Sequence, residues 1–294
     1  MARVACAGGL LVAGLLLAAS ALPAQARDTD VWLAPLARRG DTLVVGAPRN
    51  LTRRPGYDNQ PSFTPDSKAV LYTAIGADGQ ADIFRVELAT GAISRLTATP
   101  ESEYSPTVTP DGRSFSVVRV ERDSTQRLWR FPLAGGEPSL VLEQVKPVGY
   151  HAWVDDTTLA LFVLGQPATL QIASTRGGLA LPVTRGIGRG LQHVPGTRTV
   201  AFVARLGDVL MLSSYRLDSI PPRPGEERMV LLHRWTALPR QEFFAFAGST
   251  VMSASGSDLL AWTGWGKVGG PGDPWTTVAR LGGAGVREIT RLSV

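Results

Sequence analysis

The sequence predicts an all-β fold, a six-bladed β-propeller whose closing blade is shared between N- and C-terminal strands. The first observation is a repeat, because Pro61 recurs as Pro106 and Gly91 as Gly136, each at an offset of 45 residues (61 to 106, 91 to 136). A fixed period of this length, built from short strands, is typical of propeller blades. The second observation is that no segment beyond the first 26 residues has the apolar periodicity of a helix.

Each complete blade is expected to contain four short strands, with a turn after the first strand. In the first two blades this turn contains Pro65-Asp66 and Pro110-Asp111, where proline supplies the fixed φ that the second turn position favours. The expected strands of the five complete blades are residues 61–64, 69–73, 82–88 and 92–96; 107–109, 114–120, 127–133 and 139–142; 150–154, 158–164, 169–174 and 179–183; 191–194, 199–204, 209–217 and 228–232; and 242–246, 250–254, 259–263 and 275–281.

Segments from both ends of the chain are expected to form the sixth blade. Residues 30–36 and 46–52 match the third and fourth strands of the first blade, and residues 288–294 have the pattern of a first strand. We therefore expect Ile289–Val294 to pair with the blade that holds the N-terminal strands. This pairing would close the ring and protect its sheet edges.

Residues 1–26 are expected to form a signal peptide. An arginine and a long apolar run precede Ala24-Gln25-Ala26, which fits a signal peptidase site before Arg27. The alternative is an uncleaved membrane anchor, since about 20 apolar residues can span a bilayer. Cleavage would leave residues 27–294 as one periplasmic or secreted domain without a membrane span. Cleavage also removes Cys6, the one cysteine of the sequence, so no disulfide or thiol chemistry is expected.

The charge of the chain argues against a nucleic-acid partner. The formal net charge is +5, but the arginines are spread along the whole sequence. Nucleic-acid binding requires basic residues that are clustered on one stripe or face. We therefore expect the arginines to be solvated or paired on the blade surfaces.

Two repeat segments carry a resemblance to a known family. Pro61-Ser62-Phe63-Thr64-Pro65-Asp66 and Pro106-Thr107-Val108-Thr109-Pro110-Asp111-Gly112, each followed by an apolar strand, resemble the WD40-like (PD40) repeats of the TolB family. The match is strong over residues 50–140 and weaker afterwards. The resemblance implies a six-bladed, exported propeller that binds other proteins. TolB itself carries an α/β domain before its propeller, which this sequence does not match, so a role in the Tol–Pal system is not carried over.

No catalytic, cofactor or metal motif is predicted. Residues 264–269 match G-x-G-x-x-G, but Pro271 follows closely, and a dinucleotide site requires a helix there. A propeller-capped hydrolase would require a G-x-S-x-G elbow, which the sequence lacks. The repeat does not bring the three histidines, His151, His193 and His233, together, so they are not expected to converge on a metal.

Equivalent positions of the repeat are expected to pack between blades. The repeat alignment aligns Phe63, Val108, Trp153 and Phe246, and it places His193 at the same position in the fourth blade. We therefore expect all five side chains to be buried.

The segments that enter the first strand of each blade are expected to meet around the channel. We take this channel mouth as the candidate ligand-binding site, with residues Asp58, Asn59, Glu103, Tyr104, Tyr150, His151, Arg189 and Glu242. Tyr57 and Arg291 lie at the same level of the repeat. Polar side chains of both signs, together with tyrosines, can bind a peptide or small ligand. Because Asp58 and Glu103 belong to adjacent blades, we expect their carboxylates to lie close together, outside the core.

Three functions remain open from the sequence. The first choice is a monomeric binding or scaffold module that holds a protein or envelope glycan at its channel face. The alternative is a propeller enzyme, a hydrolase or lyase acting on a glycan or lactone through carboxylates at the channel mouth. The third is a structural module of a larger envelope assembly.

Overall fold

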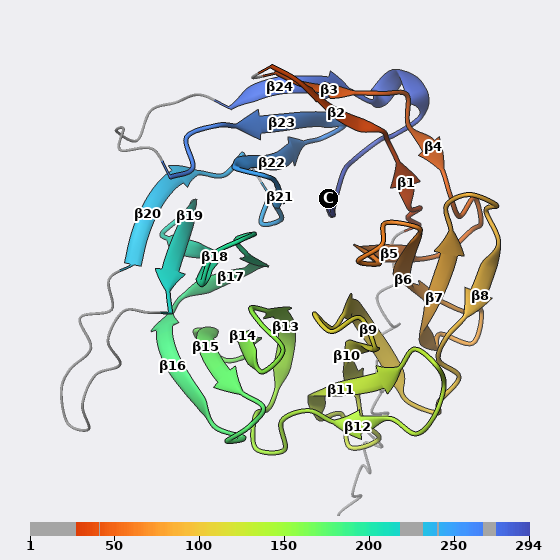
Figure 1. Cartoon of the computed structure of the whole chain (residues 1–294), viewed down its shortest axis with the longest axis vertical. Helices are drawn as coiled ribbons and strands as arrows, with labels where there is room; N and C mark the ends of the chain where they lie inside the picture. The colour runs from red at the N-terminus through yellow and green to blue at the C-terminus, as the bar shows by residue number, and fades with distance from the viewer. Residues whose placement is uncertain (1–27, 41, 218–231, 240, 267–274) are drawn as a thin grey trace, which may run out of the picture.

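The computed structural model describes residues 28–40, 42–217, 232–239, 241–266 and 275–294, and they form a ring of β-sheets around a central channel (Figure 1). Five of the sheets are four-stranded antiparallel blades. Their strands are β5 (Asp58–Phe63), β6 (Ala69–Ile75), β7 (Ala81–Glu87) and β8 (Ile93–Arg95); β9 (Ser102–Val108), β10 (Ser114–Val120), β11 (Gln126–Pro132) and β12 (Ser139–Leu140); β13 (Val148–Trp153), β14 (Thr158–Val163), β15 (Thr169–Ser174) and β16 (Ala180–Arg185); β17 (Ile187–His193), β18 (Thr199–Leu206), β19 (Val209–Arg216) and β20 (Leu232–Ala237); and β21 (Ala245–Ala247), β22 (Thr250–Ser255), β23 (Asp258–Trp262) and β24 (Thr276–Arg280).

The prediction of six blades is wrong, because the described chain forms five. The N-terminal strands β1 (Trp32–Leu33), β2 (Leu36–Arg39), β3 (Thr42–Val45) and β4 (Arg49–Asn50) pair as β1 with β4 and β2 with β3. A hydrogen bond from Gly46 N to Pro35 O (2.8 Å) joins these two ladders into one hairpin. This N-terminal hairpin lies between β24 and the first blade, where a sixth blade was expected (Figure 1).

The predicted closing strand is also wrong. After the short 3₁₀ helix η1 (Gly282–Ala284), residues 286–294 have no strand and run toward the centre of the ring (Figure 1). Ile289 N donates to Gly256 O (2.8 Å), while Ile289 and Leu292 pack against a cluster that contains Leu43 and Met252. A first strand pairs with the second strand of its blade, and the N-terminal hairpin supplies only the two outer strands. The channel segment, as we call residues 286–294, therefore has no ladder partner.

The Pro-Asp turns are stabilised by local hydrogen bonds that repeat from blade to blade. The Thr64 hydroxyl donates to Asp66 Oδ1 (2.6 Å), and Lys68 N donates to the same oxygen (3.1 Å). The hydroxyl bond from Thr64, followed by the Lys68 amide, lowers the pKa of Asp66. Thr109 and Asp111 repeat the hydroxyl bond at 2.6 Å. These repeat signatures therefore stabilise the fold and do not contribute to the site.

The hydrophobic core lies between neighbouring blades, as expected from the repeat. Val108, Trp153 and Phe246 are buried, which confirms three of the equivalent positions. Phe63 is half-buried. The prediction of a core histidine at His193 is wrong, because His193 is half-buried and its Nε2 lies 2.6 Å from Thr197 O in the following turn.

Three expectations concern residues that are not described. The expected signal peptide, residues 1–26, lies outside the described part of the chain, as do residues 267–269 of the glycine-rich segment and most of the expected strand 228–232. Among the described helices, none is long and apolar enough to cross a membrane.

Candidate ligand-binding site at the channel mouth

The inner strands of the blades surround a cavity of about 340 Å³ at the centre of the ring. Tyr150 and His151 of β13 and Arg189 of β17 line this cavity, and the channel segment lines it with Arg291. Three of the eight predicted site residues therefore reach one space. The inner strands of the first two blades begin earlier than expected, so Asp58 and Glu103 lie in strands and not in loops.

The inner strands of the first two blades contain matching backbone irregularities. Gln60 and Ser105, 45 residues apart, have φ values of 59° and 55°, in the left-handed region that non-glycine residues rarely adopt. The amide of Ser105 donates to Gln60 Oε1 at 2.7 Å, and the Thr73 hydroxyl donates to the same oxygen at 2.9 Å. These bonds link the two blades directly at the channel wall.

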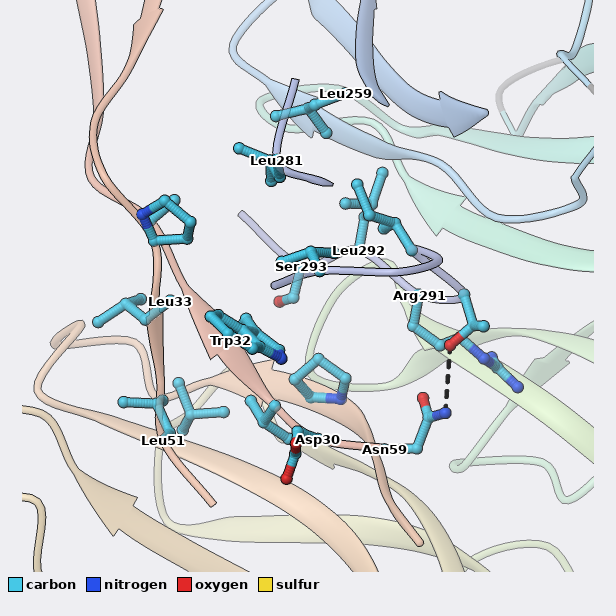
Figure 2. A pocket seen from close by; sticks show the side chains of 18 of the residues that line it. Asp30, Trp32, Leu33, Leu51, Asn59, Leu259, Leu281, Arg291, Leu292 and Ser293 are labelled. Atoms are coloured by element: carbon cyan, nitrogen blue, oxygen red, sulfur yellow. Dashed lines mark hydrogen bonds between the residues drawn. The ribbon is translucent and has the colours of Figure 1, made fainter. Parts of the chain in front are cut away.

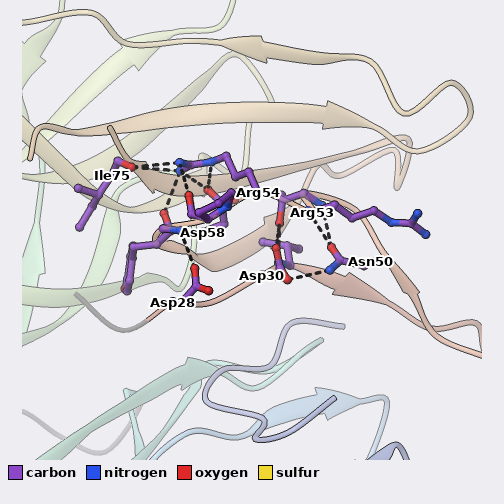
Figure 3. Close-up of polar contacts among 12 residues, drawn as sticks. Asp28, Asp30, Asn50, Arg53, Arg54, Asp58 and Ile75 are labelled. Atoms are coloured by element: carbon purple, nitrogen blue, oxygen red, sulfur yellow. Dashed lines mark hydrogen bonds and ion pairs between the residues drawn. The ribbon is translucent and has the colours of Figure 1, made fainter. Parts of the chain in front are cut away.

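Asp58 is fully buried beneath the mouth and is paired with an arginine. Arg54 contacts Asp58 Oδ1 through Nε (3.0 Å) and Nη2 (2.5 Å). Figure 3 shows the same guanidinium bridging to the backbone carbonyl of Ile75, 3.2 Å from Nη1. Burial raises the pKa of Asp58, although the hydrogen bond and charge of Arg54 act in the opposite direction.

Glu103 has an equivalent arrangement in the second blade. It is fully buried, accepts a hydrogen bond from Arg119 Nε at 3.0 Å, and contacts the Thr99 hydroxyl. The Arg119 guanidinium in turn lies over the Trp129 ring, 4.4 Å from its centroid. Burial raises the pKa of Glu103. The expectation that Asp58 and Glu103 lie outside the core is wrong, because each is buried against its own arginine.

Glu242 joins the fourth and fifth blades. Its Oε2 accepts hydrogen bonds from Arg189 N (3.0 Å) and Arg189 Nε (2.8 Å), and its Oε1 contacts Arg205 Nη2. Gly190 permits the backbone of Glu242 to approach closely, because a Cβ at position 190 would collide with the backbone carbonyl of Glu242. Glu242 is therefore a bridging residue behind the mouth.

An aromatic surface holds Arg291 of the channel segment. Its guanidinium lies over Phe243 (3.5 Å to the centroid) and Tyr150 (4.8 Å), and Nη2 donates to the Tyr150 hydroxyl at 2.8 Å. Arg189 lies over the same Phe243 ring at 5.3 Å. Burial lowers the pKa of Arg291 and raises that of the neighbouring Tyr57 to about 12.

His151 is buried, and its imidazole contacts a serine hydroxyl. Its Nε2 lies 2.6 Å from the Ser116 hydroxyl, to which the Trp153 indole N–H donates at 2.8 Å. Burial lowers the pKa of His151 to about 3, so the imidazole is neutral at physiological pH. The described residues contain no group of three or more His, Cys, Asp or Glu side chains that could hold a metal ion.

A larger cavity of about 850 Å³ lies between the N-terminal hairpin, the first blade and the channel segment (Figure 2). Trp32, Leu33 and Leu51 line it. Asn59 also lines it, and the dashed line in Figure 2 marks the bond from Asn59 Nδ2 to the Thr290 hydroxyl (3.3 Å). Asn59 therefore contacts the channel segment and not the smaller cavity.

The remaining site residues divide into those the sequence indicated and those it missed. Tyr104 is half-buried and close enough to Tyr57 to influence its pKa. Phe243 was missed because it directly follows the predicted site residue Glu242. Successive residues of a strand point to opposite faces of the sheet. Arg54 and Arg119 were also missed, because ordinary arginines carry no sequence signal for an ion pair.

Three solved structures show what this fold resembles. The putative TolB from Agrobacterium tumefaciens matches with a TM-score of 0.63 and 16% identity over 79% of this chain and 84% of that chain. TolB from Acinetobacter baumannii matches with a TM-score of 0.52 and 20% identity over 64% of this chain and 52% of that chain. This chain therefore covers about half the length of that TolB. A Mycobacterium tuberculosis puromycin-hydrolyzing peptidase matches with a TM-score of 0.52 and 15% identity, over 87% of this chain and 45% of that one.

Comparison of the sequence with protein-family models and with curated proteins finds no match. At identities of 20% or less, structural likeness establishes the fold and leaves activity open. The resemblance read from the Pro-Asp repeats is thus confirmed by the three-dimensional comparison, and the chain has the fold of the TolB-like β-propellers.

Proposed function

We propose that this protein is an exported binding module, periplasmic or secreted, whose channel mouth holds an extended segment of a partner protein. One observation carries the proposal: the channel already contains a stretch of polypeptide, since residues 291–294 line the central cavity beside the inner strands. The channel is therefore wide enough for peptide, and about 340 Å³ remains beside this segment. The cavity is also lined by the aromatic side chains that favour peptide contacts.

The catalytic alternative is ranked second because of the placement of the carboxylates. A glycan hydrolase or lyase would require an acid that reaches its substrate. Asp58 and Glu103 are fully buried, and each is paired with an arginine, while Glu242 is shared between Arg189 and Arg205. These contacts support structural roles for the three acids. Binding of an envelope glycan in place of a protein remains an outcome of the experiment below.

The experiment combines partner capture with a channel variant. The immobilised protein is used to capture envelope proteins, and segments of each captured protein are tested as synthetic peptides by isothermal titration calorimetry. The Phe243→Ala variant removes the ring that lines the cavity and carries Arg189 and Arg291. We expect it to bind about tenfold or more weakly, as truncated aromatic anchors do.

The control is Ile93→Ala, which alters an exposed residue on the outer strand β8 of the first blade. It should bind the peptide like the unmodified protein. Equal affinity of Phe243→Ala and the unmodified protein would place the binding surface outside the channel and contradict the proposal. Size-exclusion chromatography of the same samples tests the further proposal that the protein is a monomer.

A further inference from the structure

The channel mouth contains more positive than negative charge on the side of the fourth and fifth blades. Arg189 and Arg205 both contact Glu242, so two guanidinium groups share one carboxylate. Arg291 adds a third guanidinium, and within the described part of the chain no carboxylate lies at ion-pair distance from it. By contrast, the acids of the first two blades, Asp58 and Glu103, are each matched by an arginine.

The two arginines nearest the cavity lie against one aromatic ring. Arg291 and Arg189 are 3.5 and 5.3 Å from the centroid of Phe243, and both line the central cavity. A guanidinium group has five N–H donors. Among the described residues, Arg291 uses its Nη2 for the Tyr150 hydroxyl, and the remaining donors have no partner.

This arrangement favours an anion that the chain itself does not supply. Arg291 is half-buried and next to another cation, and a cation withdrawn from water is costly unless it is paired and hydrogen-bonded. Stacking on Phe243 and Tyr150 offsets part of this cost. A planar carboxylate matches the fork of a guanidinium group and accepts two parallel hydrogen bonds from it.

We infer that the channel mouth binds a carboxylate on an acidic side chain of the partner's extended segment, between Arg291 and Arg189 and beside the Tyr150 hydroxyl. This inference rests on the proposed function, to which it adds the chemistry of the partner. The acidic side chain enters the cavity between the two guanidinium groups, whose positive charges disfavour a basic side chain at the same position.

The test compares two peptides that differ only in charge. A ten-residue peptide with glutamates at alternate positions and the same peptide with glutamines are titrated by calorimetry at low and at physiological salt. The glutamate peptide is expected to bind the unmodified protein, and Arg291→Gln is expected to weaken it about tenfold to a hundredfold, as loss of a charge-assisted hydrogen bond does. Arg291→Lys retains the charge without the planar fork and should give an intermediate affinity.

The matched control is Arg130→Gln, which removes one positive charge from an exposed position on β11. It should leave the affinity unchanged at physiological salt. Arg189→Gln provides a second variant if Arg291→Gln is unfolded, because the Arg189 side chain is 53% exposed and Glu242 keeps Arg205 as a partner. Equal binding of the glutamate and glutamine peptides, or equal affinity of Arg291→Gln and Arg130→Gln, would overturn the inference.

Succinate separates this inference from the proposed function. Stabilisation of the unmodified protein by succinate, compared with chloride at equal ionic strength and lost in Arg291→Gln, shows the carboxylate site even if no peptide binds. Stabilisation by succinate, together with no binding of any peptide, would retain the carboxylate site and reject peptide binding. Conversely, peptides that bind through Phe243 without any dependence on charge would retain the binding function and reject the carboxylate site. A uronate-containing glycan that binds where peptides do not would reject the protein partner.

Discussion

Replacement of Glu103 by glutamine tests whether this acid belongs to the core or to the ligand site. The Glu103 and Arg119 side chains are 0% and 7% exposed, and they form a buried ion pair at 3.0 Å. Removing one member of such a pair leaves the other charge buried and unpaired, which costs about 3–5 kcal/mol of unfolding free energy. At pH 8, Glu103→Gln should therefore lose about 3–5 kcal/mol relative to the unmodified protein.

Glu101, which directly precedes strand β9 and is two residues before Glu103, supplies a matched control. Glu101 pairs with Arg122 at 3.4 Å, but the Arg122 side chain is 79% exposed, so water screens the pair. Glu101→Gln should cost at most about 1 kcal/mol. The measurement is urea denaturation followed by tryptophan fluorescence, with unfolding free energies taken from midpoints and slopes.

Two further observations would decide the reasoning on Glu103. The double replacement Glu103→Gln with Arg119→Met should recover part of the lost stability, because it removes the unpaired cation. A cost for Glu103→Gln no larger than that for Glu101→Gln would refute the buried-pair argument. In that case Glu103 would again be a candidate for direct ligand contact.

Three other predictions follow from burial and packing. Trp153→Ala should cost about 3–5 kcal/mol in urea denaturation, whereas Leu179→Ala, at a position 72% exposed, should change stability by less than about 0.5 kcal/mol; similar costs would contradict the inter-blade packing. Gly190→Ala should cost about 1–3 kcal/mol by overpacking against the fifth blade, and Gly177→Ala, with open space around it, should be near neutral in the same assay. Burial lowers the pKa of His151 to about 3, so the folded state binds fewer protons than the unfolded state below about pH 6.5. The contribution of neutral His151 to the free energy of unfolding is therefore full above that pH and is lost as pH falls toward 3. The His151→Gln variant should lose less unfolding free energy over this range. An identical pH profile for the two proteins would argue against a buried neutral imidazole.

The sequence by itself determined the blade repeat and its turns. Thr64 and Asp66 are two residues apart, and their hydrogen bond forms within one turn whatever surrounds it. The repeat alignment likewise predicts which side chains pack between blades, as Val108 and Trp153 show. Both signals depend on local chemistry, so a single sequence is sufficient to predict them.

The number of blades depended on the tertiary structure. Residues 288–294 have the composition of a first strand, yet a strand requires a neighbouring edge with free backbone groups. In the described chain the N-terminal hairpin pairs with itself, and Ile289 N finds its acceptor at Gly256 O instead. Sequence pattern predicts the tendency to form a strand, but the available partner decides whether the strand forms.

The sequence determined part of the candidate site, and the tertiary structure determined the rest. Repeat position predicted that Tyr150, His151 and Arg189 would approach the channel, and they line one cavity. Only the folded chain decided that Asp58 and Glu103 are buried, because Arg54 lies 4 residues and Arg119 lies 16 residues from its partner, and no pattern distinguishes these arginines from solvated ones. The contact of Arg291 with Tyr150 spans 141 residues. Contacts of this kind depend on where the ring places distant side chains, which is a property of tertiary packing and not of local sequence.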